Sequence, residues 1–146
     1  MPVNIRPLDA RDREAWLPLW QGYLDFYDTS LPQEVTDETW RRIVDPAGPI
    51  HGLGAVGEGG RLIGIVHYLF HPATWSIGPY CYLEDLFVSP DARGSGAGRA
   101  LVEAVYHAAA AANAEQVYWL TAQSNTTARK LYDRVGQVTP FIKYRR

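Results

Sequence analysis

The chain has very little cysteine: Cys81 stands alone, and no cluster of cysteines and histidines shows the spacing of metal ligands. An internal disulfide is therefore excluded, and no metal site is predicted. The N-terminal residues, Met1 to Arg6, also lack the apolar core of a secretory signal peptide. Together these absences favour a reduced, cytoplasmic protein.

Long apolar runs are absent as well. The longest extends from Leu62 to Phe70 and is interrupted by Gly64 and His67, whereas a helix that spans a bilayer needs about 20 apolar residues in a row. Positive charge is not in excess either, because the formal net charge is −2, so bulk electrostatics does not favour a polyanionic partner. We therefore expect neither a membrane role nor nucleic-acid binding.

The composition that remains is typical of one globular domain. The chain has 146 residues, of which 47% are hydrophobic, and this is enough to bury a continuous core. It contains no internal repeat and no low-complexity linker. We expect a single domain that covers residues 1–146.

In the first half, the apolar pattern predicts a strand, two helices and a hairpin. Asp9 suits an N-cap, and the apolar residues between Trp16 and Tyr27 recur at steps of three and four, as on one face of a helix. The run Thr36-Asp37-Glu38-Thr39 predicts the start of a capped second helix. The expected elements are a strand at 3–8, a first helix after Asp9, a second helix ending at Asp45-Pro46, and strands at 53–56 and 61–70 joined by the glycine-rich turn 57–60.

In the second half, a strand ending at Val88 leads through a glycine-rich turn into an alanine-rich helix. The order strand, helix, strand calls for a right-handed crossover and a parallel pair, whereas the earlier strands suit an antiparallel meander. We expect an α+β fold with a mixed, mostly antiparallel sheet flanked by about four helices. The remaining expected elements are a lead-in at 75–80, a helix at 101–112, a strand at 116–120, a helix capped by Ser124 or Asn125 and stopped by Gly136, and a terminal strand at 141–144.

The glycine-rich turn lies between Arg93 and Arg99. Bare backbone N–H groups at the start of a helix form a site for a phosphate, and flanking arginines suit phosphate contacts. The turn is not a dinucleotide motif, because Arg99 occupies the position of the third glycine, and it lacks the Gly-Lys-Ser/Thr of a P-loop. An ordinary strand-to-helix turn, in which glycine only relieves backbone strain, is the alternative.

The pattern Arg93-x-x-Gly96-x-Gly98 resembles the acyl-CoA pyrophosphate loop of the GNAT superfamily of N-acetyltransferases. The segment 82–88, Tyr-Leu-Glu-Asp-Leu-Phe-Val, looks like the catalytic strand of the spermidine/spermine acetyltransferases, and 117–121 with 125–132 looks like the second GNAT motif. With the C-terminal run 143–146, the set is most similar to the Hpa group of histone and polyamine acetyltransferases. The match covers roughly residues 60–146.

The resemblance implies a GNAT fold in which the fourth strand splays from the fifth, with acetyl-CoA as cosubstrate. The pantetheine arm of the coenzyme would pair with the main chain of the fourth strand. Asn125 would add a hydrogen bond from its amide, besides its simpler role as an N-cap. The implied cofactor-binding residues are Leu86, Phe87, Val88, Arg93, Gly94, Ser95, Gly96, Ala97, Gly98, Arg99, Asn125 and Ala128.

Acetyl transfer to an amine needs a proton acceptor, because an alkylammonium with a pKa of ~10.4 is almost fully protonated at neutral pH. Glu84 is the candidate, acting directly or through a water; the alternative is a strand-end charge paired with Arg or Lys. Strand alternation sends Glu84 and Asp85 to opposite faces, and groups Leu83 with Asp85, unless a bulge intervenes. By resemblance, Tyr132 protonates the departing thiolate; the alternative is a core tyrosine on an amphipathic helix.

Aromatic rings beside carboxylates suit a cationic or amphipathic amine, although most of the rings are expected in the core. His67 and His71 are interpreted as packing or surface residues. We expect a primary amine, either small and polyamine-like or a protein lysine, to attack acetyl-CoA directly in a ternary complex. The candidate substrate-binding residues are Tyr27, Tyr82 and Asp85.

Two further expectations concern assembly and a rival function. The resemblance suggests a homodimer, in which the terminal strand at 141–144 would pair or swap at the interface. The rival is a non-catalytic acyl-CoA binding or sensing module, which would keep Arg93, Gly96 and Gly98 but lack a working acid or base.

Overall fold

A central five-stranded sheet in the order β1-β2-β3-β4-β5 organises the protein, in a computed structural model that describes residues 2–146. The first four strands pair antiparallel and β4 pairs parallel with β5, as the strand and helix order predicts. The mixed, mostly antiparallel α+β fold is therefore confirmed. The strands are β1 Asn4–Pro7, β2 Ile50–Val56, β3 Leu62–His71, β4 Tyr80–Val88 and β5 Gln116–Tyr118.

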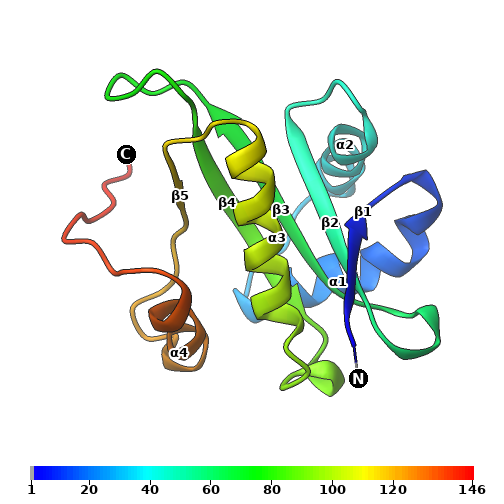
Figure 1. Cartoon of the computed structure of the whole chain (residues 1–146). Helices are drawn as coiled ribbons and strands as arrows, with labels where there is room; N and C mark the ends of the chain where they lie inside the picture. Colours follow the sequence, from blue (N-terminus) through cyan, green and yellow to red (C-terminus); the bar gives the residue numbers. More distant parts are fainter. Residues whose placement is uncertain (1) are drawn as a thin grey trace.

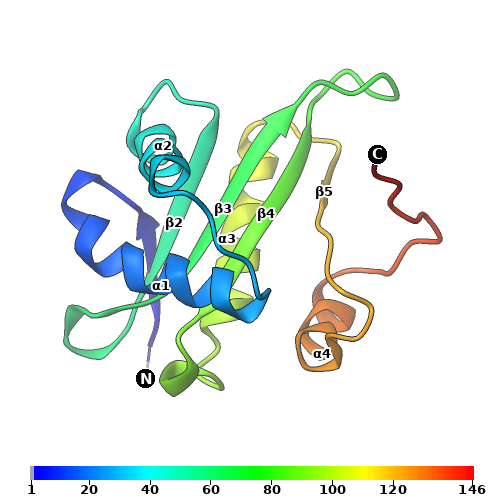
Figure 2. The ribbon, with the colours of Figure 1, turned by 180° about the vertical axis from the view of Figure 1, so that it is seen from behind.

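Helices cover both faces of the sheet. Helices α1 (Arg13–Phe26) and α2 (Gln33–Val44) lie on one face and α3 (Ala97–Ala111) on the other, while α4 (Thr126–Val135) lies beyond β5 (Figures 1 and 2). Short 3-10 turns at Ala10–Asp12, Glu58–Gly60 and Pro90–Ala92 complete the element order. None of the helices within residues 2–146 is both long and apolar enough to cross a bilayer.

Each face of the sheet has its own core. Against α3, the core contains the fully buried Leu101, Val102 and Val105, which lie on the face of the helix that is turned to the sheet. Against α1 and α2 it contains Trp16 and Trp40 with the apolar side chains around them. Burying a large apolar side chain contributes roughly 1.5–3 kcal/mol, so both helical layers are held firmly to the sheet.

Two helix starts differ in detail from the sequence analysis. Asp9 is an N-cap, but of the 3-10 turn at Ala10–Asp12, where it forms a capping box with Asp12 before α1 begins. Helix α2 begins earlier than predicted, at Gln33 after Pro32, so the assignment of Thr36 to its cap is wrong. Thr36 is instead buried inside the helix, and its Oγ1 accepts a hydrogen bond from Trp20 Nε1 at 3.2 Å.

The C-terminal part departs furthest from the predicted elements. Strand β5 ends at Tyr118 rather than Leu120, and β4 begins only at Tyr80, after an irregular loop. The predicted strand at 141–144 is wrong, because residues 137–146 form neither helix nor strand. They run as an extended segment past β5 (Figure 1). A strand requires a partner for its backbone groups, and this segment pairs with no strand within residues 2–146.

Candidate active site

The site begins where two parallel strands separate. Pairing of β4 with β5 ends at Tyr82 opposite Tyr118, yet β4 continues to Val88 while the chain after β5 turns towards α4 (Figure 2). The splay implied by the resemblance is therefore present. Within residues 2–146, no strand pairs with this side of residues 83–88, so backbone groups there are open to the amides of an extended ligand.

A β-bulge at Glu84 determines where the two carboxylates point. His67 of β3 is opposite Asp85 and the next residue, Tyr68, is opposite Leu83, which leaves Glu84 as an extra residue on β4. Leu83 is consequently buried in the α3 core, whereas Asp85 faces His67 on the α1 side. The expectation of simple alternation, which grouped Leu83 with Asp85 and separated Asp85 from Glu84, is therefore wrong.

Helix α1 passes close to β4 beside this bulge. A Cβ atom added at Gly22 would lie only 2.8 Å from the ring of Phe87, so glycine permits the close approach. The next residue, Tyr23, then lies near Asp85. Burial, followed by the negative charge of Asp85, raises the pKa of the Tyr23 phenol well above its usual range, which keeps this hydroxyl protonated.

Glu84 and Asp85 together give the site negative charge. The side chain of Glu84 reaches the surface, but neighbouring groups partly desolvate it, and this effect followed by the charge of Asp85 raises its pKa above the ordinary value. Lys143 acts in the opposite direction. A carboxylate with a raised pKa is a better proton acceptor than an ordinary one.

His67 lies in the interior beside Asp85, and its hydrogen bonds were not expected from the sequence. Its side chain is 1% exposed, its Nδ1 lies 2.9 Å from Asp85 Oδ2, and its Nε2 accepts a hydrogen bond from Trp16 Nε1 at 3.0 Å. The interpretation as a packing residue therefore holds as far as burial is concerned, but the sequence did not reveal these two hydrogen bonds. The available signal was a polar residue inside the longest apolar run of the sequence.

Aromatic rings border the carboxylates. The rings of Tyr23 and Tyr27 lie 5.1 Å apart at the end of α1, and Tyr82 stacks on Tyr118 at 4.9 Å where β4 and β5 last pair. The charge of Glu84, after burial, raises the pKa of Tyr82. The structure thus places the predicted Tyr82 beside the acidic pair, and the predicted Tyr27 beside Tyr23, which lies near Asp85. Aromatic rings next to carboxylates favour a cation.

Tyr132 lies on α4, across the splay from β4. Its ring meets that of Trp119 edge-on at 5.6 Å, and burial, followed by the neighbouring Tyr27, raises its pKa to about 12. The phenol therefore stays protonated at neutral pH. Tyr27 directly follows α1 and Tyr132 lies on α4, so this part of the site lies between the ends of the two helices.

The predicted phosphate loop forms an open turn at the start of α3. Gly94 and Gly96 have φ angles of +85° and +86°, which glycine adopts without strain. Among residues 2–146, no hydrogen-bond partner is found for the backbone N–H groups of Gly94, Gly96, Gly98 and Arg99. A Cβ added at Gly94 or Gly96 would contact nothing within 4 Å, so the space beside these two glycines is open at the positive end of a helix.

The two arginines that flank the loop have different partners. Arg93 is exposed and lies over the ring of Phe87 at 5.7 Å, next to the loop. Arg99 instead pairs with Glu103 at 2.8 Å on the surface of α3. Leu86 and Val88 pack into the α3 core, so only their main chain is available to a ligand.

Asn125 is the N-cap of α4, as predicted. Its Oδ1 accepts a hydrogen bond from the N–H of Ala128 at 3.4 Å, and its Nδ2 donates to Thr121 Oγ1 at 3.4 Å. Helix α4 also approaches the loop, because a Cβ added at Gly98 would lie 3.3 Å from Leu131 Cδ2. The start of α3 and the start of α4 therefore both border the splay.

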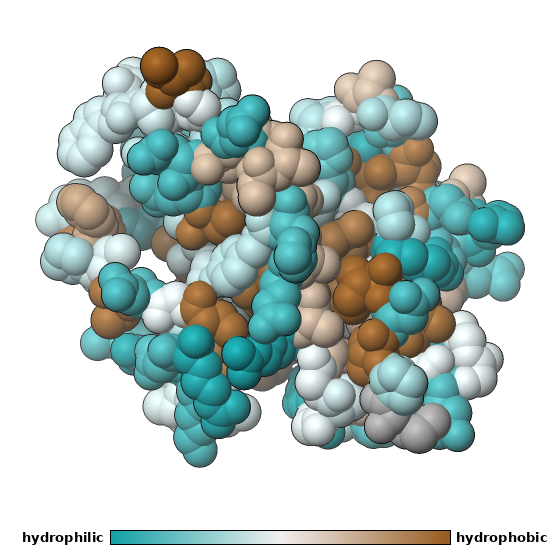
Figure 3. All heavy atoms as spheres, viewed as in Figure 1, coloured by the Kyte–Doolittle hydropathy of each residue, from teal (hydrophilic) through white to brown (hydrophobic). Residues whose placement is uncertain are grey.

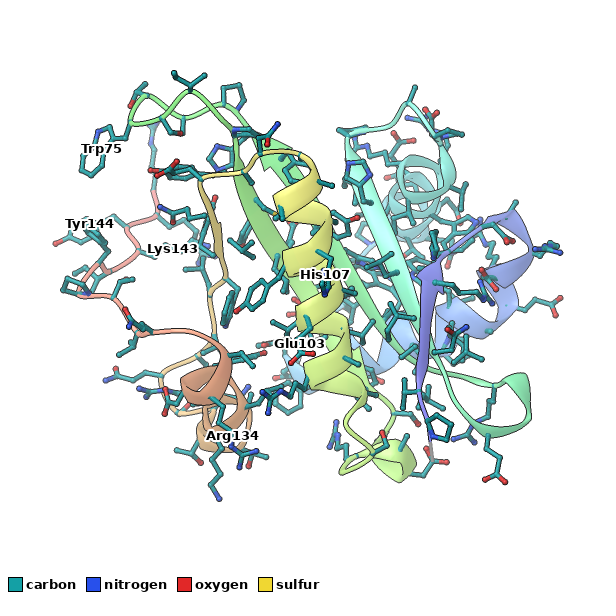
Figure 4. All side chains as sticks on the ribbon, viewed as in Figure 1. Trp75, Glu103, His107, Arg134, Lys143 and Tyr144 are labelled. Carbon is teal, nitrogen blue, oxygen red and sulfur yellow. The ribbon has the colours of Figure 1, made fainter. Side chains whose placement is uncertain are left out.

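A hollow of about 800 Å³ adjoins this region, between β5, α4 and the C-terminal segment. Tyr118 and Tyr132 line it from one side and Lys143 from the other. It is visible at the left of the molecule in the space-filling view (Figure 3). Lys143 and Tyr144 lie on the C-terminal segment beyond β5 (Figure 4).

Comparison with known proteins agrees with this geometry. The model of the acetyltransferase (GNAT) family matches residues 14–137. The D-amino-acid N-acetyltransferase HPA3 of Saccharomyces cerevisiae is 37% identical over 145 residues, covering 99% of this chain and 90% of the yeast protein. The thialysine N-epsilon-acetyltransferase of Bos taurus is 34% identical over 86 residues, 58% of this chain and 50% of the bovine protein.

Among solved structures, the aminoglycoside acetyltransferase AAC(6')-Iy in complex with a CoA-linked bisubstrate analogue has a TM-score of 0.83 at 20% identity, covering 100% of this chain and 99% of its own. At this identity the likeness concerns the fold. Because the family model matches most of the chain and a named N-acetyltransferase is similar along nearly its whole length, the chain belongs to the acetyltransferase (GNAT) family and is an N-acetyltransferase.

Proposed function

We propose that the chain transfers an acetyl group from acetyl-CoA to a primary amine by direct attack in a ternary complex. The observation that carries this proposal is the unpaired edge of β4, which has the open amide turn of α3 at one end and the acidic pair at the other. With this layout an extended acyl carrier can bind its phosphates at the turn of α3, pair its amides with the edge of β4, and present its thioester next to the acidic pair.

In this proposal the residues from Arg93 to Arg99 bind the coenzyme pyrophosphate. The free amides of the turn and the dipole of α3 attract the phosphates, and the exposed guanidinium of Arg93 adds charge. The main chain of Leu86 to Val88 pairs with the pantetheine arm. Its N–H groups polarise the thioester carbonyl in the manner of an oxyanion hole.

The acceptor enters from the side of the acidic pair. Asp85 and the rings of Tyr27 and Tyr82 hold the ammonium, and Glu84 removes its proton directly or through a water. The freed amine forms a C–N bond to the acetyl carbon while the C–S bond breaks, and the thiolate that leaves takes a proton from Tyr132. The nitrogen of the new amide gives up its second proton, which restores the Tyr132 phenol directly or through water, and Glu84 passes the proton it took from the ammonium to solvent. The thiol Cys81 takes no part, because it is buried and burial raises its pKa to about 11.

Small amines fit this site best as a class. The similar yeast protein is named for D-amino acids, the bovine one for thialysine, and the AAC(6')-Iy structure for an acetylneamine analogue. All present an amino group on a flexible or polyfunctional small molecule. A protein lysine offers the same nucleophile and remains within the proposal as a test substrate. We further propose a cytoplasmic, single-domain enzyme, with residues 1–146 forming the acetyltransferase domain.

The test is thiol release from acetyl-CoA against a panel of D-amino acids, thialysine, polyamines, aminoglycosides and a lysine peptide, with products identified by mass spectrometry. We expect turnover with at least one small amine. Tyr132→Phe removes the general acid and Glu84→Gln removes the general base, and each change should reduce turnover about 10²-fold or more. Tight acetyl-CoA binding by calorimetry without turnover on any amine would overturn the proposal and support the non-catalytic binding module.

We also propose that two copies associate through the C-terminal segment. The outer edge of β5 is unpaired within residues 2–146, and Phe141, Ile142 and Tyr144 are 77–87% exposed. An extended apolar segment beside a free strand edge is a surface on which a second chain can pair.

A further inference from the structure

Three side chains form a buried hydrogen-bonded line from α1 through β3 to β4. Trp16 is fully buried, His67 is 1% exposed, and the side chain of Asp85 is 15% exposed. Trp16 Nε1 lies 3.0 Å from His67 Nε2, and His67 Nδ1 lies 2.9 Å from Asp85 Oδ2. The line therefore runs from the interior of the α1 core to the edge of the site.

The chemistry of the first residue fixes the state of the second. An indole N–H can only donate a hydrogen bond, so Nε2 of His67 must accept and carries no proton. The proton of the neutral ring is then on Nδ1, which donates to Asp85. The tautomer of His67 and the orientation of the Asp85 carboxylate are thereby set by Trp16, a residue that lies outside the site.

Packing alone does not explain this arrangement. His67 lies against the rings of Trp16 and Trp20, in an apolar environment where a leucine would need no partners. A buried imidazole requires a partner for each nitrogen, because an unsatisfied polar group costs about 1–3 kcal/mol. Both partners are present, and the second one belongs to the acidic pair at the bulge.

We propose that His67 is a positioning residue of the acceptor site, acting through Asp85. The inference rests on the proposed function and deepens it. His67 holds Oδ2 of Asp85, which turns the remaining carboxylate oxygen towards Tyr23 and the incoming ammonium. Glu84, displaced onto the bulge, is then left for proton removal, so that binding and deprotonation of the amine are assigned to different carboxylates.

Steady-state kinetics of variants of the full chain test this role. His67→Leu removes both hydrogen bonds and should raise KM for the amine about tenfold or more, as expected for a lost hydrogen bond to a charged group. KM for acetyl-CoA should stay unchanged and kcat should change less than KM for the amine. His67→Asn keeps a donor near the position of Nδ1 and should recover a large part of the loss.

Matched controls separate positioning from general damage to the core. Trp16→Phe removes the N–H behind His67 together with part of the ring, and should raise KM for the amine several-fold. The control is Trp40→Phe, which removes the same part of a ring that is also buried and lies 4.7 Å from Trp16. Within residues 2–146 no hydrogen-bond partner is found for the Trp40 indole nitrogen, so this variant should leave KM for the amine unchanged. His51→Gln removes another histidine of the sheet, stacked on Tyr68, and should also leave KM unchanged. If His67→Leu does not fold, His67→Asn and the two tryptophan variants decide.

The outcomes distinguish this inference from the proposed function. If the wild type turns over no amine, the proposed function fails, and the proton position is then read by long-range ¹H–¹⁵N correlation of the histidine rings at neutral pH. A protonated Nδ1 supports the line described above, whereas a proton on Nε2 overturns it. If the wild type is active but the His67 and Trp16 variants keep the wild-type KM for the amine, the positioning role is overturned while the proposed function stands.

Discussion

At the scale of single residues, the phenol of Tyr132 lies in an environment that differs strongly from solution. Burial raises its pKa to about 12, so it is fully protonated at neutral pH, as a proton donor must be. Donation to a thiolate whose conjugate acid has a pKa of about 8.5 is uphill unless the bound coenzyme changes the environment.

We therefore predict that Tyr132→Phe lowers kcat about 10²-fold and leaves KM for acetyl-CoA nearly unchanged, because the ring and its contact with Trp119 are retained. Steady-state kinetics with the best amine checks this. The control is Tyr68→Phe, which removes another phenol whose pKa is raised by burial, but on the α3 face of β3. Equal loss in both variants would show that the effect is structural.

Partial burial raises the pKa of Glu84, and neighbouring charges act on this pKa in both directions, so variants of these neighbours should shift a pH profile in opposite directions. The carboxylate must be deprotonated to accept a proton, so kcat should fall as pH drops through its pKa. Asp85 raises that pKa and Lys143 lowers it. Removing the negative neighbour makes deprotonation easier, and removing the positive one makes it harder.

We predict that Asp85→Asn moves the acidic limb of the profile of kcat against pH to lower pH, and that Lys143→Met moves it to higher pH. The position of the limb at saturating amine is the measurement, because Asp85→Asn also weakens acceptor binding. Asp25→Asn, on the exposed side of α1 where it accepts from Gln21, should leave the limb in place. Shifts of the same sign in both test variants would exclude Glu84 as the titrating base.

At the scale of elements, the turn into α3 depends on glycines that take left-handed backbone angles. Gly96, with φ of +86°, and Gly59, with φ of +73°, are comparable, since a Cβ at either would meet nothing within 4 Å. Only the first lies among the free amides of the turn. Alanine at either position stores about 1 kcal/mol of backbone strain.

We predict that Gly96→Ala and Gly59→Ala lower Tm by similar amounts, roughly 2–4 °C for a chain of this size. Only Gly96→Ala should raise KM for acetyl-CoA, because its Cβ and altered backbone displace the amides that face the phosphates. Thermal melts and coenzyme titration measure the two effects. An unchanged KM in Gly96→Ala would mean that the turn does not bind the coenzyme.

Elements defined by local sequence were predicted well, and those that depend on distant partners were not. The path from β4 through the turn at Gly94 and Gly96 into α3 follows from local rules, and so does the N-cap at Asn125. The bulge at Glu84 is set by register against β3, which no local pattern encodes. The hydrogen bonds of His67 were missed for the same reason, since its partners are 51 and 18 residues away in sequence.

At the scale of the whole molecule, the sheet has different neighbours at its two edges. β1 is a short edge strand of four residues, Asn4–Pro7, whereas beyond β5 lies an extended segment that pairs with nothing described in residues 2–146. The strand predicted at 141–144 would need such a partner, which a single chain does not provide. A second copy supplies both a free edge and a matching segment.

We predict that light scattering coupled to size exclusion gives a mass near twice 16.4 kDa, and that Phe141→Ser with Ile142→Ser gives the monomer. These side chains are 80% and 77% exposed in the single chain, so their replacement removes apolar contacts between copies without disturbing either core. Val35→Ser, at an exposed apolar position of α2 on the other side of the sheet, should leave the mass unchanged. A monomeric wild type at concentrations well above those of the assay would contradict the dimer. Because Lys143 follows directly after Phe141 and Ile142, loss of the dimer should also move the acidic limb of the profile of kcat against pH that is assigned to Glu84.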